Sequence, residues 1–231
     1  MINDNFTINE RFEFLEDLTS MVITGVTPSL VVTGPGGNGK TNSVKRTIES
    51  NQLEDKDFIF FKGYSTARGL YNTLYDNNGK LIIFDDCDSV LEDKVSKNIL
   101  KSALDSYEDR TISWMSKLSK GDEYPTQFNF TGRIIFISNK SKDSIDGALK
   151  SRSLMVDLTM TPEEKIERLT LILPNILPEY DMETKELALN FLDNVKNDVD
   201  INIRTFIMVT KMCKAFPDTW RKLASYSVRQ Y

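Results

Sequence analysis

Residues 34–41 read Gly-Pro-Gly-Gly-Asn-Gly-Lys-Thr, which fits the pattern G-x-x-x-x-G-K-S/T at every specified position. This loop follows the apolar run 30–32 and precedes a stretch that we expect to be helical. Backbone N–H groups of such a glycine-rich turn can converge on phosphate oxygens, and the helix that follows adds the positive end of its dipole. The sequence therefore predicts a nucleoside triphosphate site, rather than a glycine-rich turn without a ligand.

The residues of this loop have separate expected roles. Lys40 is expected to reach the β- and γ-phosphates, and the Thr41 hydroxyl to hold magnesium. The residues expected to surround the nucleotide are Gly34, Pro35, Gly36, Gly37, Asn38, Gly39, Lys40, Thr41 and Asn42.

The composition limits the chemistry that the chain can perform. With 231 residues, 40% of them apolar, the chain can form one α/β domain and a small appendage. Cys87 and Cys213 are the only cysteines and there is no histidine, which excludes a zinc site and a histidine-based triad. The net charge of −5 argues against a broadly basic surface that coats nucleic acid, but not against a local basic loop.

Neither a basic N-terminal region nor a long apolar run is found in the sequence. We therefore expect a protein without a membrane contact, in a reducing compartment such as the cytoplasm.

Short apolar runs rich in Val, Ile and Phe are separated by helical patterns over most of the chain. This alternation predicts an α/β fold with a mostly parallel five-stranded sheet and helices on both faces. An amphipathic helix is expected before the first strand, with Phe12, Phe14, Leu15 and Leu18 on its apolar side. The expected strands are 30–33, 58–61, 81–84, 134–138 and 154–157.

Strand signals stop after Asp157. Residues 161–164, Thr-Pro-Glu-Glu, form a good helix start, because a hydroxyl can cap it, proline fits the first turn and acids favour the dipole. The remainder is expected to be helical, with breaks near Pro174, Pro178 and Pro217. We therefore predict a nucleotide-binding domain over 1–158 and a small helical lid over 159–231.

Two carboxylates follow the apolar run 81–84. Asp85 is expected to coordinate magnesium, directly or through water, and Asp86 to polarise an attacking water. The alternative is that the pair only ends the strand, since Asp is common where strands run into loops.

The order of these motifs resembles the AAA+ ATPases over nearly the whole chain. The resemblance includes the phosphate loop, the acidic strand, the run 134–139 that ends in Asn139, the stretch 148–153 and a helical lid. It implies ATP and Mg²⁺ as cofactors and a homo-oligomeric ring, with a hexamer as the expected state. Residues 84–89 look like small AAA+ ATPases encoded by bacteriophages, and Asp-Asp in place of the usual Asp-Glu occurs in viral helicase relatives.

The resemblance also assigns three polar residues. Asn139 matches sensor 1, which helps position the lytic water. Arg152 matches the arginine finger that enters a neighbouring subunit's site; in the competing interpretation Arg152 pairs within its own subunit and Arg110 or Arg133 acts in trans. Arg204 matches the sensor 2 arginine, against the alternative of an ordinary surface residue at a helix start.

Two segments are candidates for contact with a substrate. Lys62 and Tyr64 follow the second strand, where the resemblance implies a substrate-gripping loop. Residues 111–133 form an insertion that is expected to contain a hairpin, with Lys117 and Lys120 near its tip. Lysines could neutralise phosphates while Tyr64 or Trp114 stacks on bases. Alternatively, the aromatic residues of the insertion, Trp114, Phe128 and Phe130, pack onto the sheet.

The leading hypothesis is an ATPase ring that acts on DNA during phage replication or a related process, with helicase or translocase activity and a possible replication-protein partner. In that case it would work in the host cytoplasm. The alternatives are a protein-remodelling chaperone, a nucleotide switch of the helicase-loader type, and, less well matched, a small-molecule kinase. The shorter Asp86 side chain, in place of the usual Glu, predicts altered geometry or slow turnover.

Overall fold

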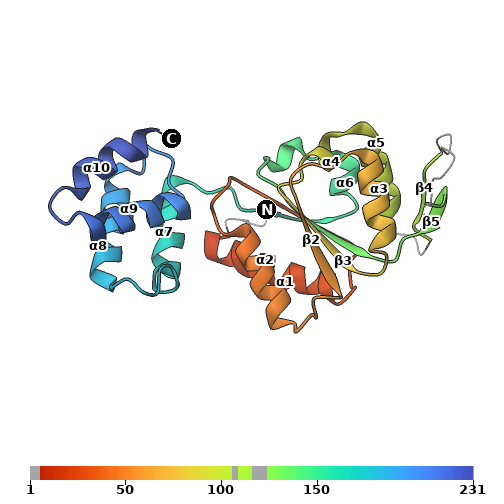
Figure 1. The fold of residues 1–231 in the computed structure, drawn as a ribbon, viewed down its shortest axis with the longest axis horizontal. Helices are drawn as coiled ribbons and strands as arrows, with labels where there is room; N and C mark the ends of the chain where they lie inside the picture. The colour runs from red at the N-terminus through yellow and green to blue at the C-terminus, as the bar shows by residue number, and fades with distance from the viewer. Residues whose placement is uncertain (1–5, 106–108, 116–123, 231) are drawn as a thin grey trace. The chain divides into compact units, whose positions relative to one another are not determined.

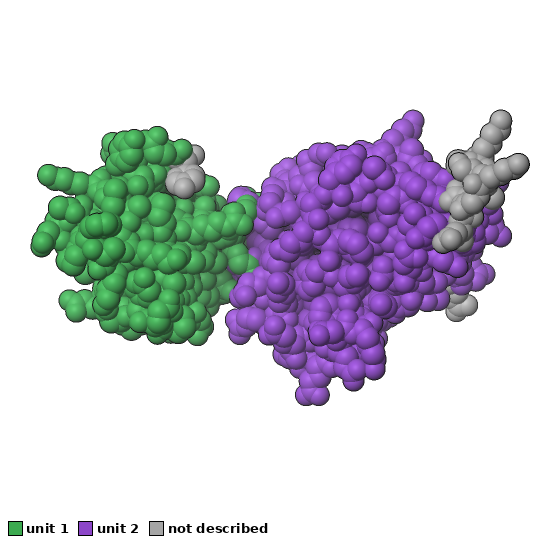
Figure 2. Space-filling model, in the orientation of Figure 1, with its two compact units in different colours: residues 1–11, 36–39, 159–231 green, residues 12–35, 40–158 purple. Residues whose placement is uncertain are grey.

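The computed structural model describes residues 6–105, 109–115 and 124–230. The chain folds as two compact units, which Figure 2 shows in different colours. An α/β unit contains residues 12–35 and 40–158, and a helical unit contains residues up to Arg11, 36–39 and 159–231. Among the described residues, none of the helices combines the length and the apolar character needed to cross a membrane.

The α/β unit is built on a five-stranded parallel sheet. Its strands are β1 (Ser29–Thr33), β2 (Phe58–Lys62), β3 (Leu81–Asp85), β6 (Arg133–Ile137) and β7 (Leu154–Asp157). Their order across the sheet is β2-β3-β6-β1-β7, and all neighbouring pairs are parallel. The five predicted strands are thereby confirmed, with bounds that differ by at most one residue.

Helices cover both faces of the sheet. Figure 1 shows α1 (Ile8–Ile23) and α2 (Lys40–Ser50) against one face and the remaining helices of this unit against the other. The second group consists of α3 (Ala67–Asp76), α4 (Ser89–Glu92), α5 (Lys94–Ala103) and α6 (Gly147–Lys150), with the short 3₁₀ helix η1 (Lys142–Ser144) before α6. The predicted α/β fold with a parallel sheet is confirmed.

The central strands are buried on both faces, which explains their uninterrupted apolar sequences. Every residue of β1 and of β3 is buried. Phe84 of β3 stacks on Phe136 of β6, with ring centroids 5.6 Å apart. The same core cluster contains Leu70 of α3 and Leu100 of α5, so these two helices are held to the sheet by apolar contact.

The apolar face of α1 differs from the predicted one. Phe12 is 2% exposed and Leu15 is fully buried, but Phe14 is 37% exposed. The buried stripe runs through Ile8, Phe12, Leu15, Thr19 and Val22, at alternating spacings of four and three residues. Phe14 lies outside this stripe, so the prediction that it belongs to the apolar face was wrong.

The insertion contains the predicted hairpin. Strands β4 (Thr111–Ser113) and β5 (Gln127–Asn129) pair antiparallel, with Ile112 opposite Phe128. Trp114 and Phe128 pack against the main core, and Phe130 is 1% exposed. The packing interpretation of these aromatic residues is therefore confirmed. Lys117 and Lys120 lie outside the described residues.

The helical unit has a core of its own. It contains α7 (Pro162–Ile172), η2 (Leu173–Asn175), α8 (Met182–Val195), α9 (Ile203–Ala215), α10 (Trp220–Ser227) and η3 (Val228–Gln230). Leu192, Phe206 and Val209 are completely buried in its core. At the start of α7, the Thr161 hydroxyl accepts the Glu164 N–H, which is the predicted cap, and the Glu164 carboxylate accepts the Thr161 N–H, which completes a capping box.

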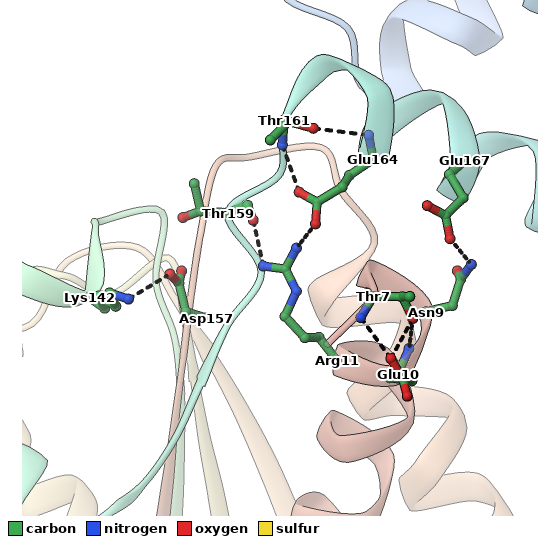
Figure 3. Close-up of polar contacts among 10 residues, drawn as sticks. All are labelled: Thr7, Asn9, Glu10, Arg11, Lys142, Asp157, Thr159, Thr161, Glu164 and Glu167. Carbon is green, nitrogen blue, oxygen red and sulfur yellow. Dashed lines mark hydrogen bonds and ion pairs between the residues drawn. The ribbon is translucent and has the colours of Figure 1, made fainter. Parts of the chain in front are cut away.

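The first turn of α1 belongs to the helical unit, which the sequence did not indicate. Asn9 Nδ2 donates to Glu167 Oε1 at 2.9 Å, and the Arg11 guanidinium donates to the Thr159 carbonyl and to the Glu164 carboxylate (Figure 3). These contacts join residues about 150 positions apart in the sequence, so they depend on the tertiary fold.

Gly132 offers a test of this packing. A Cβ at this position would lie 2.6 Å from Phe130 Cζ and 2.9 Å from the Lys80 carbonyl oxygen, and the latter belongs to the backbone. We expect Gly132→Ala to lower the free energy of unfolding by roughly 1–3 kcal/mol, because overpacking forces side chains and backbone to shift. Urea denaturation measures the change. Gly147→Ala, where a Cβ meets nothing within 4 Å, is the matched control and should cause no loss of stability.

Candidate functional site

The site lies where three neighbouring parallel strands end. Because β6 lies between β1 and β3, the loops after these strands meet at one edge of the sheet. The Asp86 N–H donates to the Ile137 carbonyl at 3.0 Å, and the Gly34 N–H donates to the Lys140 carbonyl at 3.2 Å. The sheet ladder thus continues into the loops and sets the distances between their side chains.

Lys40, at the start of α2, points back into this edge. Only 5% of the residue is exposed. Its Nζ donates to the carbonyl oxygens of Gly34 (2.6 Å) and Pro35 (2.8 Å) and to Asn139 Oδ1 (3.0 Å). The Lys40 ammonium thus lies at the phosphate loop, where its positive charge can attract an anion.

Asn139 connects this cation to the acidic strand. Its Oδ1 accepts from Lys40, and its Nδ2 donates to Asp86 Oδ1 at 2.6 Å. An amide can fill both roles because it has an acceptor at one end and donors at the other. The bridge therefore brings together three of the predicted site residues: Lys40, Asn139 and Asp86.

Asp86 has an unusual backbone conformation. Its φ is +55°, in the left-handed region that costs energy for a residue with a Cβ but that Asp tolerates better than most. The residue is exposed, and its N–H is held by the Ile137 carbonyl. The strain is consistent with a side chain held in position for a function rather than for stability.

The two candidate metal ligands are also in contact. Thr41 Oγ1 donates to Asp85 Oδ1 at 2.9 Å, and Asp85 is 1% exposed. Lys62 Nζ, at the end of β2, lies 2.7 Å from Asp85 Oδ2. Lys62, which is predicted to contact a substrate, forms this ion pair in the structure. The contact with Asp85 and its charge raise the pKa of Lys62, so this side chain is charged at neutral pH.

The phosphate loop has the backbone that the motif requires. Gly37 and Gly39 have φ values of +79° and +91°, which residues with a Cβ rarely adopt. Within the helical unit, the Ile203 N–H donates to the Gly37 carbonyl at 3.0 Å, and a Cβ on Gly37 would lie 3.0 Å from the Asn202 side chain. Both its φ and the neighbouring Asn202 side chain therefore disfavour a residue larger than glycine at position 37.

Two polar residues next to the site, Asn202 and Ser138, were missed by sequence reasoning. Asn202 caps α9 by accepting the N–H groups of Arg204 and Thr205, and it also borders Gly37. Ser138 is fully buried and donates to Asp88 at 2.6 Å, which holds the turn beside Asn139. The N-cap signal before α9 was readable from the sequence, but the neighbours of Ser138 and Gly37 depend on the fold.

The three candidate arginine fingers have different surroundings. Arg152 lies beside the first residue of β1, because its carbonyl accepts from Ser29 Oγ at 3.1 Å; its side chain donates to the Ala148 carbonyl. Arg133 donates to the Val22 and Ile23 carbonyls at the end of α1. Arg110 stacks over Phe130, and burial lowers its pKa. The side chains of all three arginines thus contact groups of their own chain.

The other candidate residues are exposed. Arg204 lies in the first turn of α9. Tyr64, next to Gly63, is 81% exposed, and Asn42 is exposed on α2.

Oxygen atoms at this edge suit a magnesium nucleotide. Thr41 Oγ1 and the buried Asp85 carboxylate are hard ligands of the kind that Mg²⁺ prefers. No group of three or more His, Cys, Asp or Glu residues in the described part of the chain could hold a metal by itself. The further ligands would therefore come from phosphate and water. In the loop, Asn38 Nδ2 is buried without an acceptor among the described residues, so a donor is present for a phosphate oxygen.

Comparison with known proteins extends these observations. No protein-family model matches the chain. Over 93% of its length it resembles a point mutant of RuvB from Thermotoga maritima, with a TM-score of 0.57 and 15% sequence identity. A structure described as the T. maritima RuvB Holliday junction branch migration motor gives a TM-score of 0.53 over 90% of the chain at 14% identity. The fold is thereby decided. The chain has the AAA+ ATPase fold.

Two curated relatives agree with the AAA+ resemblance. An uncharacterised 36.7 kDa protein of Enterobacteria phage T4, from the nrdC-mobD intergenic region, is 29% identical over 94% of this chain. Replication factor C subunit 5 of Schizosaccharomyces pombe is 24% identical over 87% of it. The resemblance to AAA+ ATPases is confirmed, and so is the similarity to a phage protein.

The chain is shorter than the proteins that it matches. It spans 73% of the phage T4 protein and 59% of the replication factor C subunit. It spans 66% and 61% of the two RuvB chains.

Proposed function

We propose that this chain is an ATPase of a homo-oligomeric ring, with a hexamer as the expected state, and that the ring acts on DNA. The observation that carries the ATPase proposal is the Asn139 bridge, which holds the Lys40 ammonium and the Asp86 carboxylate on the two ends of one amide. A phosphate-binding cation and a carboxylate that can act as a base are the two charges that hydrolysis of a phosphoanhydride needs.

Each residue of the bridge has a role in the proposed reaction. The ATP phosphates bind along residues 34–42, and Lys40 exchanges its carbonyl partners for phosphate oxygens. Asp86 accepts the proton of the attacking water, and Asn139 holds that carboxylate in place. Thr41 and Asp85 would hold Mg²⁺, which supplies charge neutralisation at the phosphates when it is bound.

The geometry at Asp86 bears on the rate of turnover. The Asp side chain is one methylene shorter than the Glu usual in the family. The left-handed φ and the 2.6 Å contact with Asn139 fix the direction of this shorter side chain. Because proton transfer depends steeply on distance, we propose slow turnover that still depends on Asp86 as the base.

Arg152 is proposed to act on the ATP of a neighbouring subunit. It lies beside Ser29, at the beginning of β1, whereas the phosphate loop follows Thr33 at the end of this strand. Four residues of extended strand span roughly 13 Å, so Arg152 is far from the phosphate loop of its own chain. A guanidinium on this opposite edge can serve a second copy, and Arg204 is proposed to sense the γ-phosphate.

DNA as the substrate is proposed from the relatives and from the exposed Tyr64. RuvB is described as a branch migration motor and the yeast relative as a replication factor subunit. From the phage relative and the replication factor relative together, a role in phage replication is proposed, in the host cytoplasm and with a replication-protein partner. The domains are proposed as 1–158 and 159–231.

A protein-remodelling chaperone or a loader-type switch is the second candidate function, since the net charge is −5 and an exposed aromatic side chain such as Tyr64 also grips polypeptides.

Removal of the bridge tests the ATPase proposal. Asn139→Ala should bind fluorescent ATP within about threefold of the wild-type affinity but hydrolyse it roughly 100-fold more slowly, because the carboxylate loses its positioning donor. Lys40→Ala should lose binding itself, and Asn190→Ala, on the exposed side of α8, should behave as wild type. Hydrolysis by Asn139→Ala at the wild-type rate would contradict the role of the bridge.

Mixed rings test the position of Arg152. Arg152→Ala and Lys40→Ala proteins should each be inactive, and their mixture should recover part of the activity, because some interfaces then join an intact loop to an intact arginine. The phosphate release rate of the mixture measures the recovery. If sizing shows mixed assemblies but the rate stays at that of the single variants, Arg152 does not act in trans.

Stimulation experiments separate the two substrate classes. We expect the ATPase rate to rise with protein concentration and, at fixed concentration, to rise severalfold with single- or double-stranded DNA in low salt and to fall back as salt is added, because phosphate contacts are screened. Stimulation by an unfolded protein instead of DNA would favour the chaperone alternative.

A further inference from the structure

A lysine from a neighbouring strand is aligned with the predicted magnesium ligand. In the parallel pairing of β2 with β3, Lys62 is the register partner of Asp85, and each is the last residue of its strand. Register partners on adjacent strands project side chains toward the same side of the sheet. The pairing of the two strands therefore places an ammonium and a carboxylate together at the edge of the site.

The two charged groups differ strongly in burial. The Asp85 side chain is 2% exposed, whereas the Lys62 side chain is 61% exposed. A buried carboxylate is costly unless a positive charge or hydrogen bonds compensate for its lost hydration. Thr41 supplies one hydrogen bond, to Oδ1, and Lys62 supplies the positive charge, 2.7 Å from Oδ2.

Lys62 is the group that lies against the second carboxylate oxygen of Asp85, Oδ2. Within the described part of the chain, no group gives Asp85 Oδ2 a well-directed hydrogen bond, so the contact with Lys62 is mainly one of charge. The Lys62 stem is exposed, and its ammonium can move into water without uncovering a core. A metal ion that binds Asp85 can thus replace Lys62 without a rearrangement of the sheet.

We propose that Lys62 is a built-in counter-ion of Asp85 that a magnesium ion must displace, and that this positioning residue sets how much Mg²⁺ the site requires. The inference rests on the proposed ATP–magnesium site and goes beyond it, because it assigns a second state to that site. Without the metal, the Lys62 ammonium neutralises Asp85; with the metal, the carboxylate exchanges one cation for the other.

A magnesium titration tests the competition. Lys62→Met keeps most of the apolar stem and removes the charge. The Mg²⁺ concentration that gives half-maximal binding of a fluorescent ADP should fall by roughly three- to tenfold, the range expected for a partly screened ion pair. Lys62→Arg, which keeps the charge, should stay near wild type. Lys56→Met removes another exposed lysine, one paired with Glu54, and is the matched control with no expected change.

Stability without metal and nucleotide gives a second measurement. In EDTA, Lys62→Met should lower the melting temperature by about 2–4 °C, because Asp85 loses its counter-charge. The double variant Lys62→Met/Asp85→Asn should recover most of this loss, since no buried charge remains to be compensated. A double variant that melts as low as, or lower than, Lys62→Met would contradict the counter-ion role.

The outcomes separate this inference from the proposed function. If wild-type protein binds ADP without any dependence on Mg²⁺, or does not bind it, the proposed site itself is wrong. If wild-type protein shows magnesium-dependent binding and Lys62→Met needs the same or a higher Mg²⁺ concentration, the site stands and only the displacement of Lys62 is overturned.

Discussion

One amide group links the two halves of the candidate site. Asn139 accepts from the Lys40 ammonium and donates to the Asp86 carboxylate, and this requires the ends of β1, β3 and β6 to lie side by side. The strand order with β6 in the middle provides that arrangement, because Asn139 then follows the strand between the phosphate loop and the acidic strand. The chemistry proposed for the chain therefore depends on the topology of the sheet as much as on its motifs.

The charged groups of the candidate site have partners within the chain. Lys40 donates to carbonyl and amide oxygens, and Asp85 is paired with Lys62. Buried charges need such partners if the fold is to remain stable before a nucleotide binds. Binding of a magnesium nucleotide would then be an exchange of internal partners for phosphate and metal, which keeps the number of uncompensated charges small in both states.

Much of the fold was readable from the sequence because buried parallel strands have uninterrupted apolar runs, and β1 and β3 are completely buried. The hairpin and the hydroxyl cap at Thr161 are local patterns, and both were predicted. The exposure of Phe14 was not predicted, although Phe12 and Phe14 are two positions apart and therefore lie on nearly opposite sides of a helix, so that only one of them can join the buried stripe. The Lys62–Asp85 pair was not predicted either, because it requires knowing that β2 lies beside β3 and in which register.

A crystal structure of the chain with Mg²⁺ and a non-hydrolysable ATP analogue tests the central claim most directly. The account predicts phosphates on residues 34–42, with Lys40 Nζ bound to phosphate oxygens in place of the Gly34 and Pro35 carbonyls. It also predicts Mg²⁺ beside Thr41 and Asp85, with Asn139 still in contact with Asp86. An analogue bound elsewhere, with the contacts of Lys40 and Asp85 unchanged, would contradict the account.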